Sequence, residues 1–272
     1  MRFGTEFYKL SGSGNDFVFF EVGSGFSEPS LTPERIAEMC ARGTGIGADG
    51  VVSFERQGGK RVRIRYWNSD GSRGALCGNA TLCAAQAAVT LGAVTGTEFT
   101  LETDAGAVAA RIDAGEVWIE LPPVTRVDSQ WLAGSGQAAV GEQIGFAVVG
   151  VPHLVVLCEN LASIDVAGLG RPLRSHSSLR DGANVNFVAR TSGEWAMRTY
   201  ERGVEAETLA CGTGAVATAI LLAHWGLSGW STRLVTKSGK RLAVELQRHG
   251  NRWLPRLSGE ARFVFRGMLA EA

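Results

Sequence analysis

The sequence has few of the residues that metal sites and disulfide scaffolds require. It contains five cysteines and four histidines among 272 residues. An odd number of thinly spread cysteines argues against a disulfide framework and indicates a reducing compartment, so we expect a cytoplasmic protein. No CxxC pair occurs, and the histidines lie far apart in the chain (His153, His176, His224 and His249). Because zinc sites need such ligands at close spacing, we expect no metal site.

Long apolar runs and blocks of like charge are also missing. No apolar stretch approaches the roughly 20 residues that a transmembrane helix needs, and residues 1–16 lack the apolar core of a signal peptide. Lysine plus arginine balances aspartate plus glutamate at 27 each, without a basic cluster. Nucleic acid and anionic membranes are therefore not expected as partners. The length and the apolar fraction of 45% predict one large or two ordinary globular domains.

What the chain does contain is a cysteine at the start of a glycine-rich helix pattern. Residues 201–219 read ERGVEAETLACGTGAVATA, so that Cys211 is followed by Gly212-Thr213-Gly214 and then by small residues. The first N–H groups of a helix have no partner within the helix, and with the helix dipole they favour negative charge. A cysteine at such a position has a lowered pKa, and the N–H groups can hold a carboxylate.

This pattern occurs twice. Cys77-Gly78 and Cys211-Gly212 lie 134 positions apart. An internal repeat of this kind predicts two similar halves. We therefore expect an α/β fold with mixed α+β sheets, in two pseudo-symmetric halves. Each half is expected to wrap a sheet round one central helix, with the active site in the cleft between the halves. Other residue pairs keep the offset to within one residue: Tyr66 and Tyr200, Gly106 and Gly239, and Trp118 and Trp253.

Pro122-Pro123 marks the expected boundary between the halves. We expect an N-terminal half at residues 1–121, to which a last strand at about 261–272 returns, and a C-terminal half at residues 122–260. Each half then carries one of the two repeated cysteines. With these bounds, each half contains one of the two helix N-termini that follow Cys77 and Cys211.

Periodicity and turn residues predict the elements within each half. Thr32 is the expected N-cap of a helix that starts at Pro33 and ends near Ala41. Two further helices are expected at 78–91 and 212–225, each closed by a glycine. The expected strands are 17–22, 51–55, 61–67, 98–103, 108–113, 117–121, 144–149, 154–157, 184–190, 195–201, 233–236 and 242–246.

Two glycine-rich segments have the letters of a nucleotide-binding loop. Residues 45–50, GIGADG, follow a helix and precede a strand, which is the reverse of a dinucleotide fold. We interpret them as a backbone loop that needs positive φ. Residues 212–217 open a helix but lack an acidic residue about twenty positions on, and there is no Walker lysine. Neither segment therefore predicts nucleotide binding or phosphate transfer.

Cys77 and Cys211 differ from the other three cysteines, which we interpret as small buried apolar residues (Cys40, Cys83 and Cys158). A cysteine protease needs one thiol and a histidine base, and a dithiol oxidoreductase usually carries CxxC. Two facing thiols instead suit stereoinversion, in which one thiol removes a proton from carbon and the other returns a proton from behind. Two helix N-termini can stabilise the substrate carboxylate electrostatically. Since no lysine lies in a pyridoxal-phosphate-like context, no cofactor is expected.

The chain contains a series of short polar and glycine-rich motifs: Gly14-Asn15-Asp16-Phe17, residues 45–50, Asn68-x-Asp70-Gly71-Ser72, Cys77-Gly78-Asn79, Pro152-His153, Asn184-Val185-Asn186-Phe187, Glu201-Arg202-Gly203 and residues 207–214. These motifs span nearly the whole chain, and together they resemble the diaminopimelate epimerase family. The resemblance implies a pseudo-symmetric two-domain α/β fold, usually a homodimer, without pyridoxal phosphate. It also implies the interconversion of LL- and meso-diaminopimelate for lysine and cell-wall synthesis.

The resemblance assigns roles to residues at matching positions. It implies that Cys77 and Cys211 are the acid/base thiols and that His153 and Glu201 influence their ionisation. Glu201 would also bind an ammonium group, and Arg202 offers the planar fork that suits a carboxylate. The other implied substrate-binding residues are Gly78, Asn79, Gly212 and Thr213 at the reacting carboxylate, Asn68 and Asn184 at the distal end beside Arg202, and Asn15 lining the site.

Three departures from the family pattern bear on substrate choice. Val151 stands where many members have Asn, Leu82 stands where Arg is common, and one more residue than usual separates Gly203 from Glu207. Two alternatives therefore stay open, a racemase of another amino acid on the same scaffold and a non-catalytic protein that binds a small zwitterion. Incubation with LL-diaminopimelate in deuterated buffer separates them.

Overall fold

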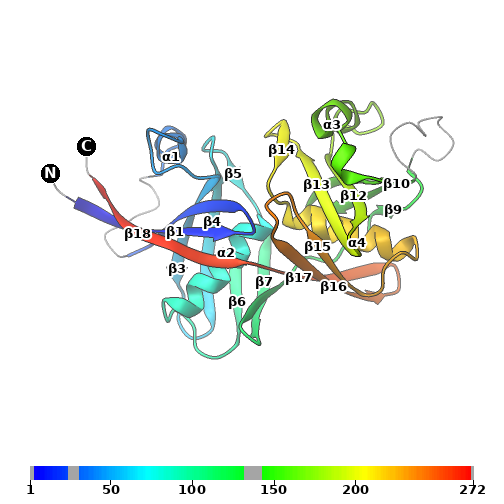
Figure 1. Cartoon of the computed structure of the whole chain (residues 1–272). Coiled ribbons are helices and arrows are strands. Elements are labelled where there is room, and N and C mark those ends of the chain that lie inside the picture. The colour runs from blue at the N-terminus through cyan, green and yellow to red at the C-terminus, as the bar shows by residue number, and fades with distance from the viewer. Residues whose placement is uncertain (1–2, 24–30, 132–142, 271–272) are drawn as a thin grey trace. The chain divides into compact units, whose positions relative to one another are not determined.

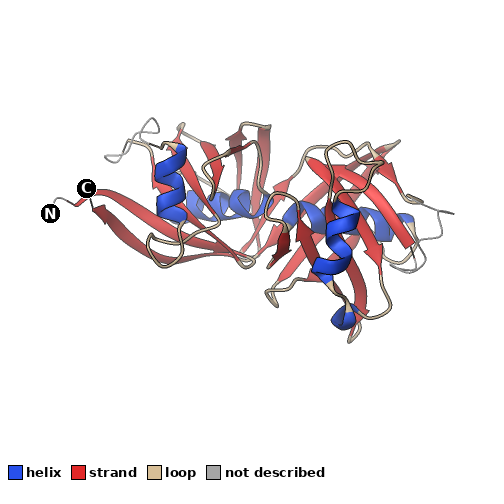
Figure 2. Ribbon diagram, turned by 90° about the horizontal axis from the view of Figure 1, so that it is seen from above, coloured by secondary structure: helices blue, strands red, loops and turns tan. Residues whose placement is uncertain are grey.

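The computed structural model of the chain describes residues 3–23, 31–131 and 143–270. Its contacts divide the chain into two units. Unit 1 comprises residues 1–119 and 259–272, and unit 2 comprises residues 120–258. Each unit is a mixed α+β structure in which one long helix is surrounded by strands (Figures 1 and 2). Among the described residues, no helix is long and apolar enough to cross a bilayer.

Unit 1 is built around helix α2 (Gly78–Thr90), which is rich in alanine and almost entirely buried. Alanine has the highest helix propensity, and its small side chain lets strands pack closely on every face. A shorter helix, α1 (Pro33–Cys40), packs over β2 and β3. The strands are β1 (Phe3–Gly12), β2 (Asn15–Glu21), β3 (Gly50–Arg56), β4 (Arg61–Asn68), β5 (Arg73–Gly74), β6 (Glu98–Thr103), β7 (Gly106–Asp113), β8 (Glu116–Glu120, ending in unit 2) and β18 (Ala261–Ala270).

Unit 2 has the same plan around helix α4 (Gly212–His224), which is also buried along most of its length. Helix α3 (Val166–Arg174) and the short 3₁₀ helix η2 (Leu161–Ser163) pack on the sheet with the apolar core of this unit. The strands are β9 (Val127–Asp128), β10 (Gln143–Val149), β11 (Val151–Leu157), β12 (Asn184–Thr191), β13 (Glu194–Glu201), β14 (Ala206–Thr208), β15 (Ser231–Val235), β16 (Arg241–His249) and β17 (Arg252–Gly259, ending in unit 1).

The strand pairings repeat from one unit to the other. In unit 1, β2 runs parallel to β3, β3 antiparallel to β4, and β4 parallel to β6. In unit 2, β11, β12, β13 and β15 are paired in the same sequence of directions. Phe17 lies opposite Gly50 as His153 lies opposite Asn184. The internal repeat predicted from the sequence is confirmed.

The predicted helices and strands all occur, with ends shifted by a few residues at most. Thr32 caps α1 as expected, and its Oγ1 accepts a hydrogen bond from the Arg35 N–H at 3.3 Å. No element was predicted at β1, β17 or α3. Helix α3 contains Gly168, Gly170 and Pro172, which disfavour a helix in isolation. It forms because Asp165 caps its N-terminus and because its apolar side is buried in the core of unit 2.

Residues 45–49 of the GIGADG segment form a loop between α1 and β3, and Gly50 begins β3. Gly47 has a φ of +75°, a conformation that strains any residue with a side chain. The N–H groups of Gly45 and Gly47 donate to the carbonyls of Ala41 and Met39. A Cβ on Gly45 would lie 2.1 Å from the carbonyl oxygen of Glu38. The interpretation of this segment as a backbone loop is confirmed.

Candidate active-site residues

Cys77 is the N-cap residue of helix α2. Its backbone is extended, with φ −129° and ψ 117°, and its carbonyl accepts hydrogen bonds from the N–H and Oγ1 of Thr81 at 2.9 and 2.8 Å. Cys77 therefore comes directly before the first N–H groups of the helix, which belong to Gly78 and Asn79. These groups have no acceptor within the helix, so they are suited to an anion.

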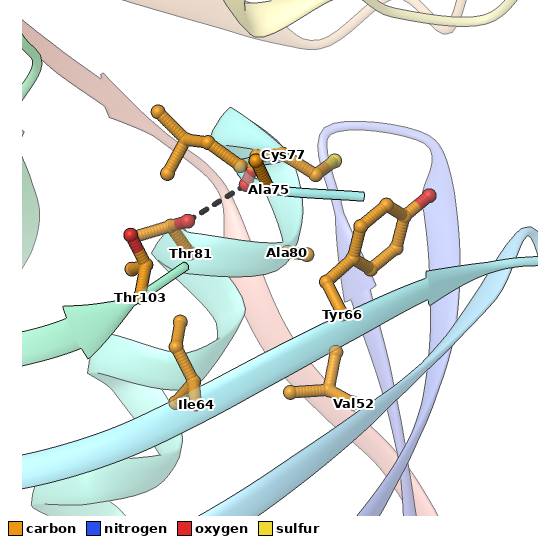
Figure 3. Close-up of a pocket in the computed structure, with 9 residues that line it drawn as sticks. Val52, Ile64, Tyr66, Ala75, Cys77, Ala80, Thr81 and Thr103 are labelled. Carbon is orange, nitrogen blue, oxygen red and sulfur yellow. Dashed lines mark hydrogen bonds between the residues drawn. The ribbon is translucent and has the colours of Figure 1, made fainter. Parts of the chain in front are cut away.

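A small pocket lies beside Cys77 within unit 1 (Figure 3). Its apolar wall is formed by Val52 from β3 and by Ile64 and Tyr66 from β4, and Thr81 closes it on the helix side. These apolar side chains lie on one side of Cys77, which is itself half-buried.

The Tyr66 ring is held between two glycines. A Cβ on Gly50 or on Gly74 would lie 2.6 Å from a ring carbon of Tyr66, so neither position tolerates a side chain without moving the ring. The Tyr66 hydroxyl donates to Oδ1 of Asn68 at 2.9 Å, and Asn68 Nδ2 donates to Oγ of Ser72 at 2.9 Å. The tyrosine therefore fixes the amide of a predicted substrate-binding asparagine.

Asn79 and Asn15 are joined directly in unit 1. Asn79 Nδ2 donates to Asn15 Oδ1 at 2.6 Å, and Asn15 Nδ2 donates to Asp49 Oδ2 at 3.0 Å. Arg42 pairs with the other oxygen of Asp49 at 2.8 Å. The Oδ1 atom of Asn79 is buried and has no hydrogen-bond partner in the part of the chain that the structure describes. It is an acceptor that a bound ligand could use.

Cys211 occupies the matching position in unit 2, as the N-cap residue of α4. Its backbone is again extended, with φ −137° and ψ 108°, and its carbonyl accepts from the N–H of Ala215 at 2.9 Å. The residue is buried, and its Sγ lies 3.6 Å from the Oγ1 of Thr213. The predicted helix starts at both cysteines are confirmed, and Gly212 and Thr213 begin the helix here as Gly78 and Asn79 do in unit 1.

His153 lies beside this helix start and is fully buried on β11. Its Nε2 is 3.1 Å from Oγ1 of Thr213, and its Nδ1 is 3.2 Å from Nδ2 of Asn186. Burial, together with the positive charge of Arg202, lowers the pKa of His153 to about 3. The ring is therefore neutral near pH 7, so it acts on its neighbours through hydrogen bonds.

Asn184, Glu201 and Arg202 meet where β12 begins and β13 ends. Asn184 Oδ1 accepts from the backbone N–H of Arg202 at 2.8 Å, and Arg202 Nη1 donates to the carbonyl of Asp181 at 2.9 Å. Glu201 is the last residue of β13 and is paired with Ala206 of β14. The guanidinium of Arg202 is thus tethered at one nitrogen.

The turn after Arg202, which holds the extra residue noted in the sequence, is fastened by Glu205. This carboxylate accepts from the Gly203 N–H at 3.0 Å and pairs with Arg174 of α3 at 2.7 Å. Glu205 adopts a φ of +57°, an uncommon conformation for a residue with a side chain. The longer turn is therefore anchored to α3.

The two other departures lie in different surroundings. Leu82 is fully buried in the core of unit 1, so it contributes to packing along α2. Val151 is half-buried at the start of β11, two residues before His153, where it is paired with Val149.

The remaining cysteines confirm their interpretation as structural residues. Cys40, Cys83 and Cys158 are at most 7% exposed. Burial raises the pKa of Cys40 to about 11 and raises that of Cys83 well above its usual value. Neither thiol is a ready source of thiolate near neutral pH.

The structure brings the predicted residues together in two groups, one in each unit. Asn15, Cys77, Gly78 and Asn79 meet at the start of α2, and Asn68 is linked to the pocket there through Tyr66. In unit 2 the residues around α4 are His153, Cys211, Gly212 and Thr213, with Asn184, Glu201 and Arg202 at the strand ends.

Sequence reasoning missed the roles of Asn186 and Asp49. Both stand in motifs that were recognised, but only their neighbours were assigned functions. Asn184 and Asn186 alternate along one strand, so their side chains share a face, and this spacing could have singled out Asn186. The contact between Asp49 and Asn15 joins residues 34 positions apart and has no local signal.

The chain matches known proteins over nearly its whole length. The diaminopimelate epimerase family profile matches residues 7–123 and 145–264. A Gemmatimonas aurantiaca protein named diaminopimelate epimerase is 46% identical over 275 residues, covering 97% of this chain and 99% of that protein. An Aquifex aeolicus protein of the same name is 36% identical, covering 98% of each chain.

Solved structures share the fold at low sequence identity. A phenazine biosynthesis protein of the PhzF family from Bacillus anthracis has a TM-score of 0.73 at 17% identity, covering 98% of this chain and 99% of that one. A predicted epimerase from Pseudomonas aeruginosa has a TM-score of 0.69 at 18% identity, covering 98% of this chain and 100% of that one. Together with two cysteine-capped helices in a repeated fold, the sequence matches show that this chain belongs to the diaminopimelate epimerase family.

Proposed function

We propose that this chain epimerises LL-diaminopimelate to meso-diaminopimelate, without a cofactor, through Cys77 and Cys211. The observation that carries the proposal is the matched placement of these cysteines as N-caps of α2 and α4. Family membership and the 46% identical relative named diaminopimelate epimerase support the choice of substrate.

In the proposed reaction the two thiols act from opposite faces of the substrate α-carbon. One cysteine, as thiolate, takes the α-proton, so that the C–H bond breaks and its electron pair stays on the substrate. The other cysteine, as thiol, delivers a proton to the same carbon from the opposite face. The two cysteines have then exchanged protonation states, and no external acid or base is consumed. A positioned acid or base of this kind contributes about 10²–10⁴-fold to the rate.

Charge that develops as the α-proton leaves is stabilised at the substrate carboxylate. The N–H groups of Gly78, Asn79, Gly212 and Thr213 belong to the first turns of α2 and α4, where donors lack partners within the helix. These donors are fixed before the reaction, so they stabilise the transition state without reorganising. The proposal requires both helix starts to act on one carboxylate.

The distal end of the substrate is assigned to a second set of residues. Arg202 is suited to the distal carboxylate because one of its guanidinium nitrogens is tethered to Asp181 and the fork is thereby held in place. Glu201 is assigned to an ammonium group by charge. The Asn184 side chain supports Arg202 by accepting a hydrogen bond from the Arg202 backbone N–H. Asn68 is oriented by the hydroxyl of Tyr66.

Incubation with LL-diaminopimelate in deuterated buffer tests the proposed activity. We expect deuterium at one α-carbon together with inversion to the meso form. Mass spectrometry measures the deuterium, and chiral chromatography measures the inversion. Inertness towards LL-diaminopimelate beside turnover of another amino acid would select a racemase of different substrate. Binding without exchange on any amino acid would select a non-catalytic binding protein.

The assignment of the thiols is tested by single substitutions. Cys77→Ala and Cys211→Ala should each lower kcat/KM by at least about 10²-fold, because one proton transfer loses its carrier. Cys158→Ala is the matched control, since Cys158 is a buried thiol in the apolar core of unit 2. It should keep the kinetic constants of the unmodified protein. Full activity of either helix-start variant contradicts the two-thiol assignment.

We also propose a cytoplasmic homodimer. In unit 1, β2 pairs with β1 only from Tyr8 to Gly12, whereas β18 pairs along the whole length of β1. Strand β18 exposes apolar side chains at Val264, Phe265 and Met268, between 45% and 48%. Neighbouring exposed apolar residues on a projecting strand pair favour association. Light scattering should give the mass of a dimer, and Phe265→Glu should shift it to the monomer; a monomeric unmodified protein overturns this.

A further inference from the structure

A series of polar side chains in unit 2, linked by hydrogen bonds, leads to the sulfur of Cys211. Thr199 Oγ1 donates to Asn186 Oδ1 at 3.0 Å, and Asn186 Nδ2 lies 3.2 Å from Nδ1 of His153. His153 Nε2 lies 3.1 Å from Thr213 Oγ1, which lies 3.6 Å from Cys211 Sγ. Thr199, Asn186 and His153 are all at most 2% exposed, so they have few alternatives to these contacts.

The orientation of the Asn186 amide is fixed by a backbone carbonyl. The carbonyl oxygen of Leu154 lies 2.9 Å from one end of the amide, and this oxygen can only accept a hydrogen bond. The end that faces it must therefore be the NH₂ group. The hydroxyl of Thr199 donates to the other end, as the amide oxygen requires. The second hydrogen of the NH₂ group then points at His153 Nδ1.

This hydrogen decides the tautomer of His153. Since Asn186 donates to Nδ1, that nitrogen must carry a lone pair, and the neutral ring carries its proton on Nε2. Nε2–H then donates to Thr213 Oγ1. Burial and the charge of Arg202 keep the ring neutral near pH 7, so a second ring proton does not alter this direction.

The threonine hydroxyl has one hydrogen, and its direction follows. Because Thr213 Oγ1 accepts from His153, its own hydrogen is available for Cys211, at a distance ordinary for a hydrogen bond to sulfur. We propose that Asn186 is a positioning residue that turns the neutral His153 into a donor, so that the Thr213 hydroxyl donates to the Cys211 sulfur and favours its thiolate. This inference rests on the proposed function, in which Cys211 alternates between thiol and thiolate.

Two features of the fold bear on this series of hydrogen bonds. A Cβ on Gly214 would lie 2.3 Å from Asn186 Oδ1, so only glycine leaves room for the asparagine beside the helix start. In unit 1 the strand position that matches His153 is Phe17, opposite Gly50 as His153 is opposite Asn184. A phenylalanine ring has no N–H to donate. The two halves of the repeat therefore differ at this point. The series of hydrogen bonds that ends at Cys211 is specific to unit 2.

The tautomer is measured directly by nitrogen NMR of protein with labelled histidine side chains. Loss of a signal set in His153→Gln assigns the residue. We expect a neutral ring protonated at Nε2 between about pH 6 and 8, a range in which an ordinary histidine changes charge. In Asn186→Asp, which places an acceptor opposite Nδ1, we expect the proton on Nδ1. A signal from the unmodified protein that shows Nδ1–H or a charged ring overturns the proposal, whether or not the variant folds.

The effect on Cys211 is measured by its alkylation rate against pH, read by peptide mass mapping. Thr213→Val removes the hydroxyl and should move the pH midpoint upward by about one unit, the equivalent of a hydrogen bond to a charged group. Thr213→Ser keeps the hydroxyl and should restore the original midpoint. Thr218→Val is the matched control, because Thr218 is buried on the same helix with an Oγ1 that has no hydrogen-bond partner among the described residues.

An unchanged midpoint in Thr213→Val, or an equal shift in Thr218→Val, overturns the donation to sulfur. Failure of the proposed function gives a different result, namely full epimerase activity in Cys211→Ala. Neither the NMR signal nor the alkylation midpoint depends on turnover. The two hypotheses can therefore fail separately.

Discussion

Asn79, in the first turn of α2, donates a 2.6 Å hydrogen bond from Nδ2 to Oδ1 of Asn15, at the start of β2. Asn79 is 2% exposed, so this bond is shielded from water. Asn15 is held in turn by Asp49. The helix start that carries Cys77 is thereby connected to the loop before β3.

Asp49→Ala tests this connection. The substitution removes the acceptor of Asn15 Nδ2 and of the Asp16 N–H, so Asn15 can turn away from Asn79. We expect kcat/KM to fall about tenfold and the free energy of unfolding to fall by about 1 kcal/mol, the net worth of a hydrogen bond between partly buried groups. Steady-state kinetics and urea unfolding measure both. Asp113→Ala removes an exposed carboxylate of unit 1 and should change neither; equal losses in the two variants contradict the connection.

Gly214→Ala tests the close packing at the start of α4. The added Cβ would lie 2.3 Å from Asn186 Oδ1 and 3.2 Å from Cys211 Sγ, so the neighbours must move. We expect a loss of about 1–3 kcal/mol in the free energy of unfolding and a fall in kcat. Gly229→Ala is the matched control, since nothing lies within 4 Å of its added Cβ. If both variants unfold at the same denaturant concentration as the unmodified protein, the packing argument is wrong.

Glu205→Ala tests the anchoring of the turn after Arg202. Without this carboxylate the turn loses its bonds to Arg174 and to the Gly203 N–H, and Arg202 is held less firmly. We expect KM to rise about threefold with kcat little changed, because an exposed ion pair of this kind is worth about 0.2–1 kcal/mol. Glu194→Ala, which removes an exposed ion pair at the start of β13, should leave KM unchanged. A fall in kcat at constant KM would contradict a binding role.

The buried His153 predicts a specific dependence of stability on pH. The unfolded chain binds a proton at this residue below about pH 6.5, whereas the folded protein does so only near pH 3. Between these values the unfolded state binds more protons, so the free energy of unfolding falls as pH is lowered. The contribution is at most about 1.4 kcal/mol per pH unit. Urea unfolding from pH 7 to pH 5 should show a smaller slope in His153→Gln; identical slopes refute the prediction.

Local patterns in the sequence were enough to predict much of the fold. Cysteine-glycine at two helix starts, the glycines that end those helices, and the alternating strands all depend on neighbours within a few residues. Helix α3 was missed because Gly168, Gly170 and Pro172 oppose a helix locally, and only burial of its apolar side in unit 2 makes it stable. Strand β1 was missed because its partner β18 lies at the other end of the chain.

The sequence by itself determined the repeat, the two cysteines at helix starts and the family, because these follow from residue identity and spacing. The tertiary structure decided how those residues are supported. Asn186 reaches His153, and Asp49 reaches Asn15, across separations of 33 and 34 positions. Such contacts depend on strand register and on the exclusion of water, which local sequence does not encode. These contacts determine which atoms donate hydrogen bonds and which accept them, and thus the chemical environment of each cysteine.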